Sequence, residues 1–379
     1  MSSTELRRRL ADSRRWVVKV GSALATREGV GLNLEAIESW ARQMVALQQA
    51  GHQVVVVTSG SVAEGAARLG WTRRPHQLNQ LQAAAAVGQM GLVRGWNQAY
   101  EKFGRRAAQV LLTHEDLSDR QRYLNARSTL WTLLELDVFP VINENDTVAT
   151  AEISLGDNDT LAGLVSNLIE ADLLVILTDQ AGLMSADPRQ DPAAELIDYA
   201  RVDDPELERI AGDGGAWGRG GMRTKLRAAR LAARSATSTI IASGRRDDVL
   251  GAIARGESVG TLLHSTREKV AARKQWLAGS IRPRGRMWLD AGACTALTAQ
   301  GKSLLAVGVQ AVEGEFSRGE LVMLHGPDGR ELGRGLVNYA AAECQRIKGL
   351  ASSQIEQALG YIREPELIHR DNLLLDTFL

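Results

Sequence analysis

The sequence predicts an α/β fold for its first two thirds: a three-layer sandwich with a mainly parallel central sheet, followed by a small β-rich domain. Over the first 265 residues, short and continuously apolar runs alternate with longer stretches of helical periodicity. Continuous apolar runs are typical of strands that are buried on both faces, as in parallel sheets. After about residue 270 the runs become shorter and glycine punctuates them, which is typical of a β-rich roll or barrel.

Six apolar runs are the predicted strands of the first domain: WVVKV (16–20), QVVVVTS (53–59), AQVLLT (108–113), VFPVIN (138–143), DLLVILT (172–178) and STIIAS (238–243). Between the first two runs, apolar residues recur at helical spacing from Leu34 to Leu47, with Asn33 as a candidate N-cap and Gly51 as a candidate end. Further helices are predicted over 61–70, 77–103, 120–136, 158–170 and 222–236. This repeated order of strand, helix and strand predicts an α/β sandwich.

Composition and punctuation predict three segments. A first domain spans residues 1–275 and ends on the charged stretch REKVAARKQWLAG. Turn signals such as Pro-Asp-Gly separate the short strands of a second domain, residues 284–363, and residues 364–379 form a C-terminal tail.

The overall charge excludes a strongly basic nucleic-acid binder. Lys and Arg total 45, and so do Asp and Glu. The chain has two cysteines and no CxxC pair, which favours a reducing compartment. No apolar run approaches the roughly 20 residues of a membrane span. We therefore expect a cytoplasmic protein without membrane or nucleic-acid partners.

Polar residues follow several of the predicted strands, at the edge where open parallel sheets bind ligands. Each of them taken alone is more often a turn, a cap or a solvated charge. Their joint placement at one edge favours a site. The segments concerned are Lys19-Val20-Gly21-Ser22, Thr58-Ser59-Gly60, Asn143 to Asp146, Thr178-Asp179, and the later stretch GRGGMRTKLRAA, which carries Lys225.

The residue types at this edge favour phosphoryl transfer. Two lysines and glycine-rich backbone amides suit a phosphate chain and its developing charge. Carboxylates and amides without histidine suit an ammonium group, magnesium or the orientation of the lysines. No general base is evident, but a carboxylate nucleophile with a pKa of about 4.3 is already ionised at pH 7. The residues are therefore compatible with phosphoryl transfer onto a small molecule that bears a carboxylate.

At these motifs the sequence resembles the amino-acid kinase family over nearly its whole length. KVGSAL and RGGMRTK resemble its two lysine loops, TSGSVAEG its second glycine turn, and LTDQAGLMSADPR its nucleotide segment. INENDTV and GDNDTLAG resemble its amino-acid clusters, and together with GGMxTK they resemble the members that act on L-glutamate. GRMWLDAGA, GKSLL, VEGEFSRGE and RGLVNY resemble a PUA domain.

This resemblance implies transfer of the γ-phosphate of ATP to the side-chain carboxylate of L-glutamate. The product is γ-glutamyl phosphate, the first intermediate of proline biosynthesis. Lys19 and Lys225 would neutralise the transferring group, and Asp159 would orient them. The implied glutamate-binding residues are Ser59, Asp146, which would hold the α-ammonium, and Asn158.

The resemblance also implies ATP and Mg²⁺ as cofactors, without identifying the metal ligands. Arg219 and Arg223 stand where smaller polar residues are expected. The implied nucleotide-binding residues are Lys19, Thr178, Asp179, Arg219, Gly220, Gly221, Met222, Arg223, Thr224 and Lys225.

The further implications are feedback inhibition by proline, a homo-oligomer (dimer or tetramer) and glutamyl phosphate reductase as a partner. One alternative is a family member that acts on aspartate, acetylglutamate or carbamate. A second alternative is RNA binding through the PUA-like domain. From Ile281 to the end, however, 11 Lys and Arg face 12 Asp and Glu, whereas a nucleic-acid module is usually basic.

Overall fold

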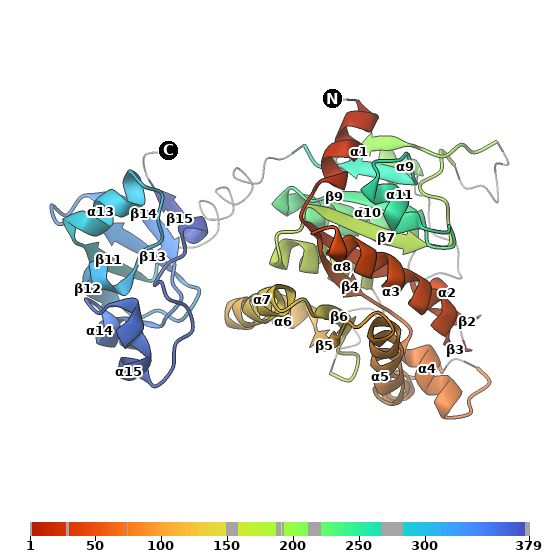
Figure 1. The fold of residues 1–379 in the computed structure, drawn as a ribbon, viewed down its shortest axis with the longest axis horizontal. Coiled ribbons are helices and arrows are strands. Elements are labelled where there is room, and N and C mark those ends of the chain that lie inside the picture. Colours follow the sequence, from red (N-terminus) through yellow and green to blue (C-terminus); the bar gives the residue numbers. More distant parts are fainter. Residues whose placement is uncertain are drawn as a thin grey trace. The chain divides into compact units, whose positions relative to one another are not determined.

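The computed structural model describes residues 2–27, 30–73, 75–148, 158–186, 191, 193–210, 221–266 and 283–375. The chain divides into two compact units. The first comprises residues 1–118 and 125–269, and the second comprises residues 119–124 and 270–379. Figure 1 shows an α/β unit and a smaller, β-rich unit. The predicted end of the first domain near residue 275 lies outside the described residues.

The first unit contains an eight-stranded sheet in the order β5-β6-β4-β1-β7-β9-β10-β8. Neighbouring strands from β5 to β9 run parallel, whereas β10 is antiparallel to β9 and parallel to β8. The predicted fold class, with a mainly parallel sheet, is confirmed. The strands are β1 Arg15–Val20, β4 Gln53–Val57, β5 Ala107–Leu112, β6 Phe139–Glu144, β7 Leu173–Thr178, β8 Tyr199–Arg201, β9 Ser238–Ser243 and β10 Thr261–His264.

The six predicted helices correspond to α3, α4, α5, α7, α8 and α10, whose ends lie close to the predicted positions, whereas the shorter helices α1, α2, α6, α9 and α11 were not predicted. Asn33 caps α3, because its side-chain oxygen accepts a hydrogen bond from the backbone nitrogen of Ala36 at 3.2 Å. Gly51 follows that helix with a φ of 96°, which glycine adopts without steric cost. The helices are α1 Ser3–Ala11, α2 Ser22–Ala25, α3 Leu34–Gln49, α4 Ser61–Arg68, α5 Leu78–Glu101, α6 His114–Ser118, α7 Arg120–Glu135, α8 Asn158–Leu168, α9 Glu206–Ile210, α10 Met222–Ala232 and α11 Val249–Ala254. The two short strands β2 Thr26–Arg27 and β3 Val30–Leu32 pair in antiparallel orientation.

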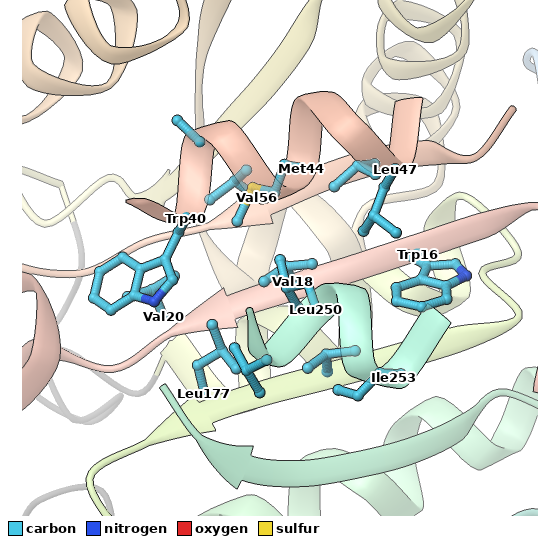
Figure 2. Packing of buried hydrophobic residues seen from close by; sticks show 14 of the residues in the cluster. Trp16, Val18, Val20, Trp40, Met44, Leu47, Val56, Leu177, Leu250 and Ile253 are labelled. Atoms are coloured by element: carbon cyan, nitrogen blue, oxygen red, sulfur yellow. The ribbon is translucent and has the colours of Figure 1, made fainter. Parts of the chain in front are cut away.

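A continuous apolar core fills the space between the sheet and helices α3 and α11. Alternate residues of β1 point to this face because successive side chains of a strand point to opposite faces. Trp16 and Val18 of β1 meet Met44 of α3 and Leu250 and Ile253 of α11 (Figure 2). All five side chains are buried. This packing fixes the sheet from one side and leaves its other face to α8 and α10.

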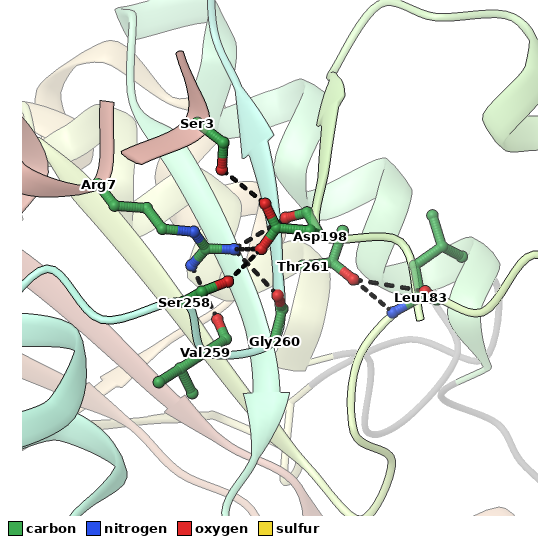
Figure 3. Close-up of polar contacts among 8 residues, drawn as sticks. All are labelled: Ser3, Arg7, Leu183, Asp198, Ser258, Val259, Gly260 and Thr261. Carbon is green, nitrogen blue, oxygen red and sulfur yellow. Dashed lines mark hydrogen bonds and ion pairs between the residues drawn. The ribbon is translucent and has the colours of Figure 1, made fainter. Parts of the chain in front are cut away.

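The amino-terminal helix α1, which the sequence did not predict, is fastened to the sheet edge near β10 by a buried arginine (Figure 3). The guanidinium of Arg7 donates to the carbonyl oxygens of Val259 at 2.9 Å, Asp198 at 2.8 Å and Gly260 at 3.0 Å. It also forms an ion pair with the carboxylate of Asp198 at 2.9 Å. Nearby, Thr261 accepts a hydrogen bond from the backbone nitrogen of Leu183 at 2.8 Å, so the segment after β7 is attached to the same edge.

The second unit is built on a five-stranded sheet in the order β12-β11-β13-β14-β15. Residues 373–375 lie within the predicted C-terminal tail, but they form β15 and pair with β14. The sequence missed this strand because it is only three residues long. The elements are β11 Gly285–Leu289, α13 Ala291–Thr298, β12 Val309–Gly314, β13 Leu321–His325, β14 Glu331–Leu336, α14 Ala341–Ile347, α15 Ile355–Leu359 and β15 Leu373–Leu375. None of the described helices is long and apolar enough to cross a membrane.

Candidate active site

Two buried lysines from distant parts of the chain share one carboxylate. Lys19 lies near the carboxyl end of β1, Asp159 in the first turn of α8, and Lys225 in the first turns of α10. The Nζ atom of Lys19 lies 2.6 Å from Oδ1 of Asp159, and Nζ of Lys225 lies 3.3 Å from Oδ2. All three side chains are more than nine-tenths buried. The structure thus brings together the three residues to which the resemblance gave the catalytic roles.

The charges of the lysines keep this carboxylate ionised. Burial alone would raise the pKa of Asp159, but the ammonium groups of Lys19 and Lys225, with a hydrogen bond from Thr224, lower it to about 2. Burial lowers the pKa of Lys225, and Asp159 opposes that shift. The three side chains carry two positive charges and one negative charge. The cluster therefore favours an anion beside the lysines.

Close packing of α8 against α10 sets the distance between Asp159 and Lys225. A Cβ atom on Gly163, one turn after Asp159, would lie 2.7 Å from the carbonyl oxygen of Ala228 and 3.1 Å from Cβ of Leu231. Such a contact is too short for any side chain, so only glycine permits this approach. The same face of α8 that presents the carboxylate therefore also fixes the separation of the two helices.

A second polar cluster surrounds Asn158, the residue just before Asp159. The Nδ2 atom of Asn158 donates to the carbonyl oxygen of Thr58 at 2.7 Å, to Oγ of Ser59 at 2.8 Å and to Oδ1 of Asn143 at 3.0 Å. These groups come from the carboxyl ends of β4 and β6 and from the turn after β4. Asn158 and Ser59, both predicted to bind glutamate, are therefore in direct contact.

Asp146, the third predicted glutamate-binding residue, joins the same region through α4. The hydroxyl of Ser61 donates to Oδ2 of Asp146 at 3.1 Å, and both residues are buried. Ser61 begins α4 directly after Gly60, whose φ is 116°. This conformation favours glycine and lets the chain turn sharply from β4 into the helix. Ser59 and Ser61 of one turn thus contact Asn158 and Asp146.

Apart from Lys19 of β1, the predicted nucleotide-binding residues that the structure describes lie at the carboxyl end of β7 and at the start of α10. Thr178 ends β7, and its hydroxyl donates to the carboxylate of Asp179 at 3.1 Å. Burial lowers the pKa of Lys225, and the charge of Asp179, like that of Asp159, opposes this shift. The hydroxyl of Thr224 donates to Asp159 at 2.7 Å and to the carbonyl oxygen of Gly221 at 2.8 Å.

Four further positions belong to the predicted nucleotide-binding set. Met222 begins α10, and Arg223 is an exposed residue of its first turn. Arg219 and Gly220 lie outside the described residues. The nucleotide-binding role of this segment stays a prediction.

Comparison with known proteins identifies the family. Residues 14–243 match the amino acid kinase family, and residues 285–359 match the PUA domain. The chain belongs to the amino acid kinase family. It is 60% identical over 371 residues to the Glutamate 5-kinase of Ectopseudomonas mendocina and to that of Pseudomonas syringae pv. tomato. The Glutamate 5-kinase of Stutzerimonas stutzeri is 59% identical over the same length. Each match covers 98% of this chain and 100% of the relative.

The structure of this amino acid kinase adds residues that sequence reasoning missed. Ser61 lies in TSGSVAEG and Gly163 in GDNDTLAG, but neither was assigned a role, and Gln89 lies in no motif. Gln89 lies in the middle of α5, and the Nδ2 atom of Asn143 donates to its side-chain oxygen at 2.7 Å. Gly163 lies inside a helix, where an isolated glycine signals a packing or functional constraint.

Proposed function

We propose that this protein transfers the γ-phosphate of ATP to the side-chain carboxylate of L-glutamate, which yields γ-glutamyl phosphate and ADP. The observation that carries the proposal is the buried cluster of Lys19, Asp159 and Lys225, next to the polar cluster around Asn158. The first cluster suits a phosphoryl group, and the second suits an amino acid. The full-length similarity to proteins named Glutamate 5-kinase supports glutamate as that amino acid. It does not favour aspartate, acetylglutamate or carbamate, nor an RNA-binding protein.

Lys19 and Lys225 act by electrostatic stabilisation. A carboxylate oxygen of glutamate attacks the γ-phosphorus, a new O–P bond forms, and the bond from that phosphorus to the β-phosphate oxygen breaks as ADP leaves. Negative charge on the transferring group is stabilised by two ammonium groups that are already in place. Asp159 remains ionised because its pKa is about 2. It therefore holds both lysines without taking up a proton.

The reaction needs no general base, because the glutamate side chain is ionised at neutral pH. The predicted glutamate-binding residues Ser59, Asp146 and Asn158, called the glutamate cluster below, orient that anion. Asp146 offers a carboxylate to the α-ammonium, while Ser59 and Asn158 offer a hydroxyl and an amide. Correct orientation of the attacking oxygen matters because a misplacement of about 1 Å costs roughly 100-fold in rate.

Magnesium accompanies the nucleotide in this proposal. Mg²⁺ is usually bound by phosphate oxygens and water together with one or two protein carboxylates. Among the described residues there is no group of three or more His, Cys, Asp or Glu side chains that could hold an ion. The donor set therefore fits a metal that enters on ATP phosphates. Bound there, it would neutralise phosphate charge, while Thr178, Asp179 and the segment from Arg219 to Lys225 bind the nucleotide.

A hydroxamate assay tests the proposed reaction. Purified protein is incubated with MgATP, hydroxylamine and one candidate acid, since hydroxylamine traps acyl phosphates as coloured hydroxamates. We expect colour with L-glutamate and little with L-aspartate or N-acetylglutamate. The shorter aspartate would misplace its carboxylate by one methylene, and N-acetylglutamate lacks the α-ammonium. Equal rates with L-glutamate and L-aspartate would refute the assignment of the substrate.

Several finer properties complete the proposal. Proline, whose ring nitrogen is also cationic, binds at the glutamate site as an inhibitor. The protein acts as a homo-oligomer, a dimer or tetramer, in the cytoplasm, and glutamyl phosphate reductase takes up its unstable product. The PUA domain modulates regulation or assembly. Size determination by light scattering and inhibition assays with proline test these properties separately.

A further inference from the structure

We propose that Gln89 of α5 is a positioning residue for the glutamate side of the site. Its side-chain oxygen completes a chain of hydrogen-bonded amides that holds Asn143 and Asn158 in place. This inference rests on the proposed function and deepens it, because it assigns a residue that supports recognition of the amino acid. Gln89 belongs to none of the motifs on which the resemblance is based.

The carbonyl oxygen of Thr58 determines which way the side-chain amides of Asn158 and Asn143 are oriented. The Nδ2 atom of Asn158 lies 2.7 Å from the carbonyl oxygen of Thr58. A carbonyl oxygen can only accept a hydrogen bond, so the amide nitrogen of Asn158 must face it. The same nitrogen lies 3.0 Å from Asn143, which must therefore present its oxygen. As a result, the amide nitrogen of Asn143 points away from Asn158.

Gln89 supplies the acceptor at the other end of the chain. The Nδ2 atom of Asn143 lies 2.7 Å from Oε1 of Gln89. Asn143 is only 1% exposed, so water is a poor substitute for the lost partner. A buried donor without an acceptor is costly, and its side chain tends to turn toward another partner. If Asn143 turned, Asn158 would lose one of its acceptors.

Within this series of hydrogen-bonded amides, one acceptor, Oδ1 of Asn158, lies unused where the substrate is expected. Among the residues that the structure describes, the Oδ1 atom of Asn158 is buried and has no hydrogen-bond partner. An unpartnered buried oxygen needs a donor, and the α-ammonium of glutamate is such a donor. The position of this oxygen depends on the amide nitrogen of the same side chain. Gln89 thus acts on the substrate through Asn143 and Asn158.

Gly88, which precedes Gln89 in α5, packs closely against Ser61, the residue that contacts Asp146. A Cβ atom on Gly88 would lie 1.9 Å from the carbonyl oxygen of Ser61. The hydroxyl of Ser61 donates to Asp146 at 3.1 Å. Two consecutive residues of α5 therefore support the two parts of the site, one by close packing and one by a hydrogen bond.

The test compares two variants of the full-length protein, one without and one with a side-chain oxygen at position 89. Gln89→Met removes it, whereas Gln89→Glu retains an oxygen at the same reach. All three residues have similar helix propensity. Gln98→Met is the matched control, because Gln98 is an exposed residue of the same helix. The KM values for L-glutamate and for ATP are measured separately by the hydroxamate assay, and folding is checked by circular dichroism.

We expect the KM for L-glutamate to rise roughly 10-fold in Gln89→Met, the scale of an unsatisfied buried donor. The KM for ATP should stay within about 2-fold, since the change affects binding of one substrate only. Gln89→Glu and Gln98→Met should resemble the wild type. Should Gln89→Met not fold, Gln89→Lys, which offers only donors to Asn143, is expected to show the same rise.

Three outcomes would overturn the inference: an unchanged KM for L-glutamate in Gln89→Met, an equal rise in both KM values, or equal effects of the Met and Glu variants. Each of these leaves the proposed function intact as long as the wild type phosphorylates L-glutamate. A wild type that forms no hydroxamate with L-glutamate contradicts the proposed function itself. The two failures are therefore distinguishable.

Discussion

Replacement of Asp159 by asparagine isolates the charge that holds the two lysines. The side chain keeps its shape and loses its negative charge. In the native site its two oxygens lie 2.6 Å from Nζ of Lys19 and 3.3 Å from Nζ of Lys225. After the substitution, two buried ammonium groups face a neutral amide. Burial and the charge of Lys19 already lower the pKa of Lys225, and the variant loses the carboxylate that opposes them.

The size of this effect follows from the distance. Two unit charges at 3.3 Å attract each other by about 5 kcal/mol at an effective dielectric constant of about 20. Loss of that attraction lowers the pKa of Lys225, so that a larger part of the enzyme carries a neutral lysine at neutral pH. A neutral lysine cannot stabilise the transferring phosphoryl group. We therefore expect kcat at pH 7.5 to fall by roughly 100-fold or more, the scale for removal of one charge-stabilising donor.

The pH profile distinguishes this explanation from loss of shape. In Asp159→Asn, kcat should rise again as the pH is lowered, because the lysine regains its proton. The wild type should show no such rise. Asp203→Asn, which removes an exposed ion pair with Arg201, serves as a control and should leave kcat unchanged. An Asp159→Asn enzyme with native kcat, or with a low kcat that does not respond to pH, would refute the reasoning.

Three further substitutions and one titration test other parts of the structure. Gly163→Ala should push α8 from α10, lower the free energy of unfolding by about 1 to 3 kcal/mol and reduce kcat, as measured by urea denaturation and the hydroxamate assay. Arg7→Met should lower the free energy of unfolding by about 3 kcal/mol, because buried carbonyl oxygens lose their donor, whereas exposed Arg8→Met should not. Asp146→Ala should raise the KM for L-glutamate by roughly 10-fold or more, because the α-ammonium loses its charged partner, whereas the KM for ATP should not change comparably. Because the pKa of Asp159 is about 2 in the folded protein, below its usual value, the stability that it contributes should be present above about pH 4 and lost as the pH falls toward 2, which acid denaturation followed by circular dichroism can check.

The parallel strands and most helices were predictable because local sequence determines them. A strand buried on both faces must be apolar throughout, and each predicted run from WVVKV to STIIAS coincides with a strand. The start of α3 carried a recognisable cap, Asn33. The amino-terminal helix α1 was not predictable in this way, because it is charged and is held by Arg7 against residues about 190 to 250 positions later.

The sequence predicted which residues form the candidate site from their types and motifs, but it did not predict their contacts. Lys19 and Lys225 could be selected because they lie at the end of an apolar run and after a glycine-rich turn, and Asp159 because GDNDTLAG resembles a family motif. That one carboxylate bridges both lysines is a property of the folded chain, since 140 positions separate Lys19 from Asp159. Gln89 gave no signal, because glutamine in the middle of a helix is ordinary on a protein surface. Its role appears only when the partner of Asn143 is identified.

The glutamate cluster and the cluster of Lys19, Asp159 and Lys225 are joined in the first turn of α8. Asn158 contacts the turn after β4 and the end of β6, and the next residue, Asp159, contacts the lysines of β1 and α10. Because backbone geometry fixes the distance between consecutive residues, any shift of α8 displaces the amino-acid cluster and the lysine cluster together. The glycine contact at Gly163 restrains that shift. The alignment of the attacking carboxylate with the phosphoryl group is therefore set by the packing of a buried helix, and a rigid element of this kind holds reacting groups more precisely than a loop can.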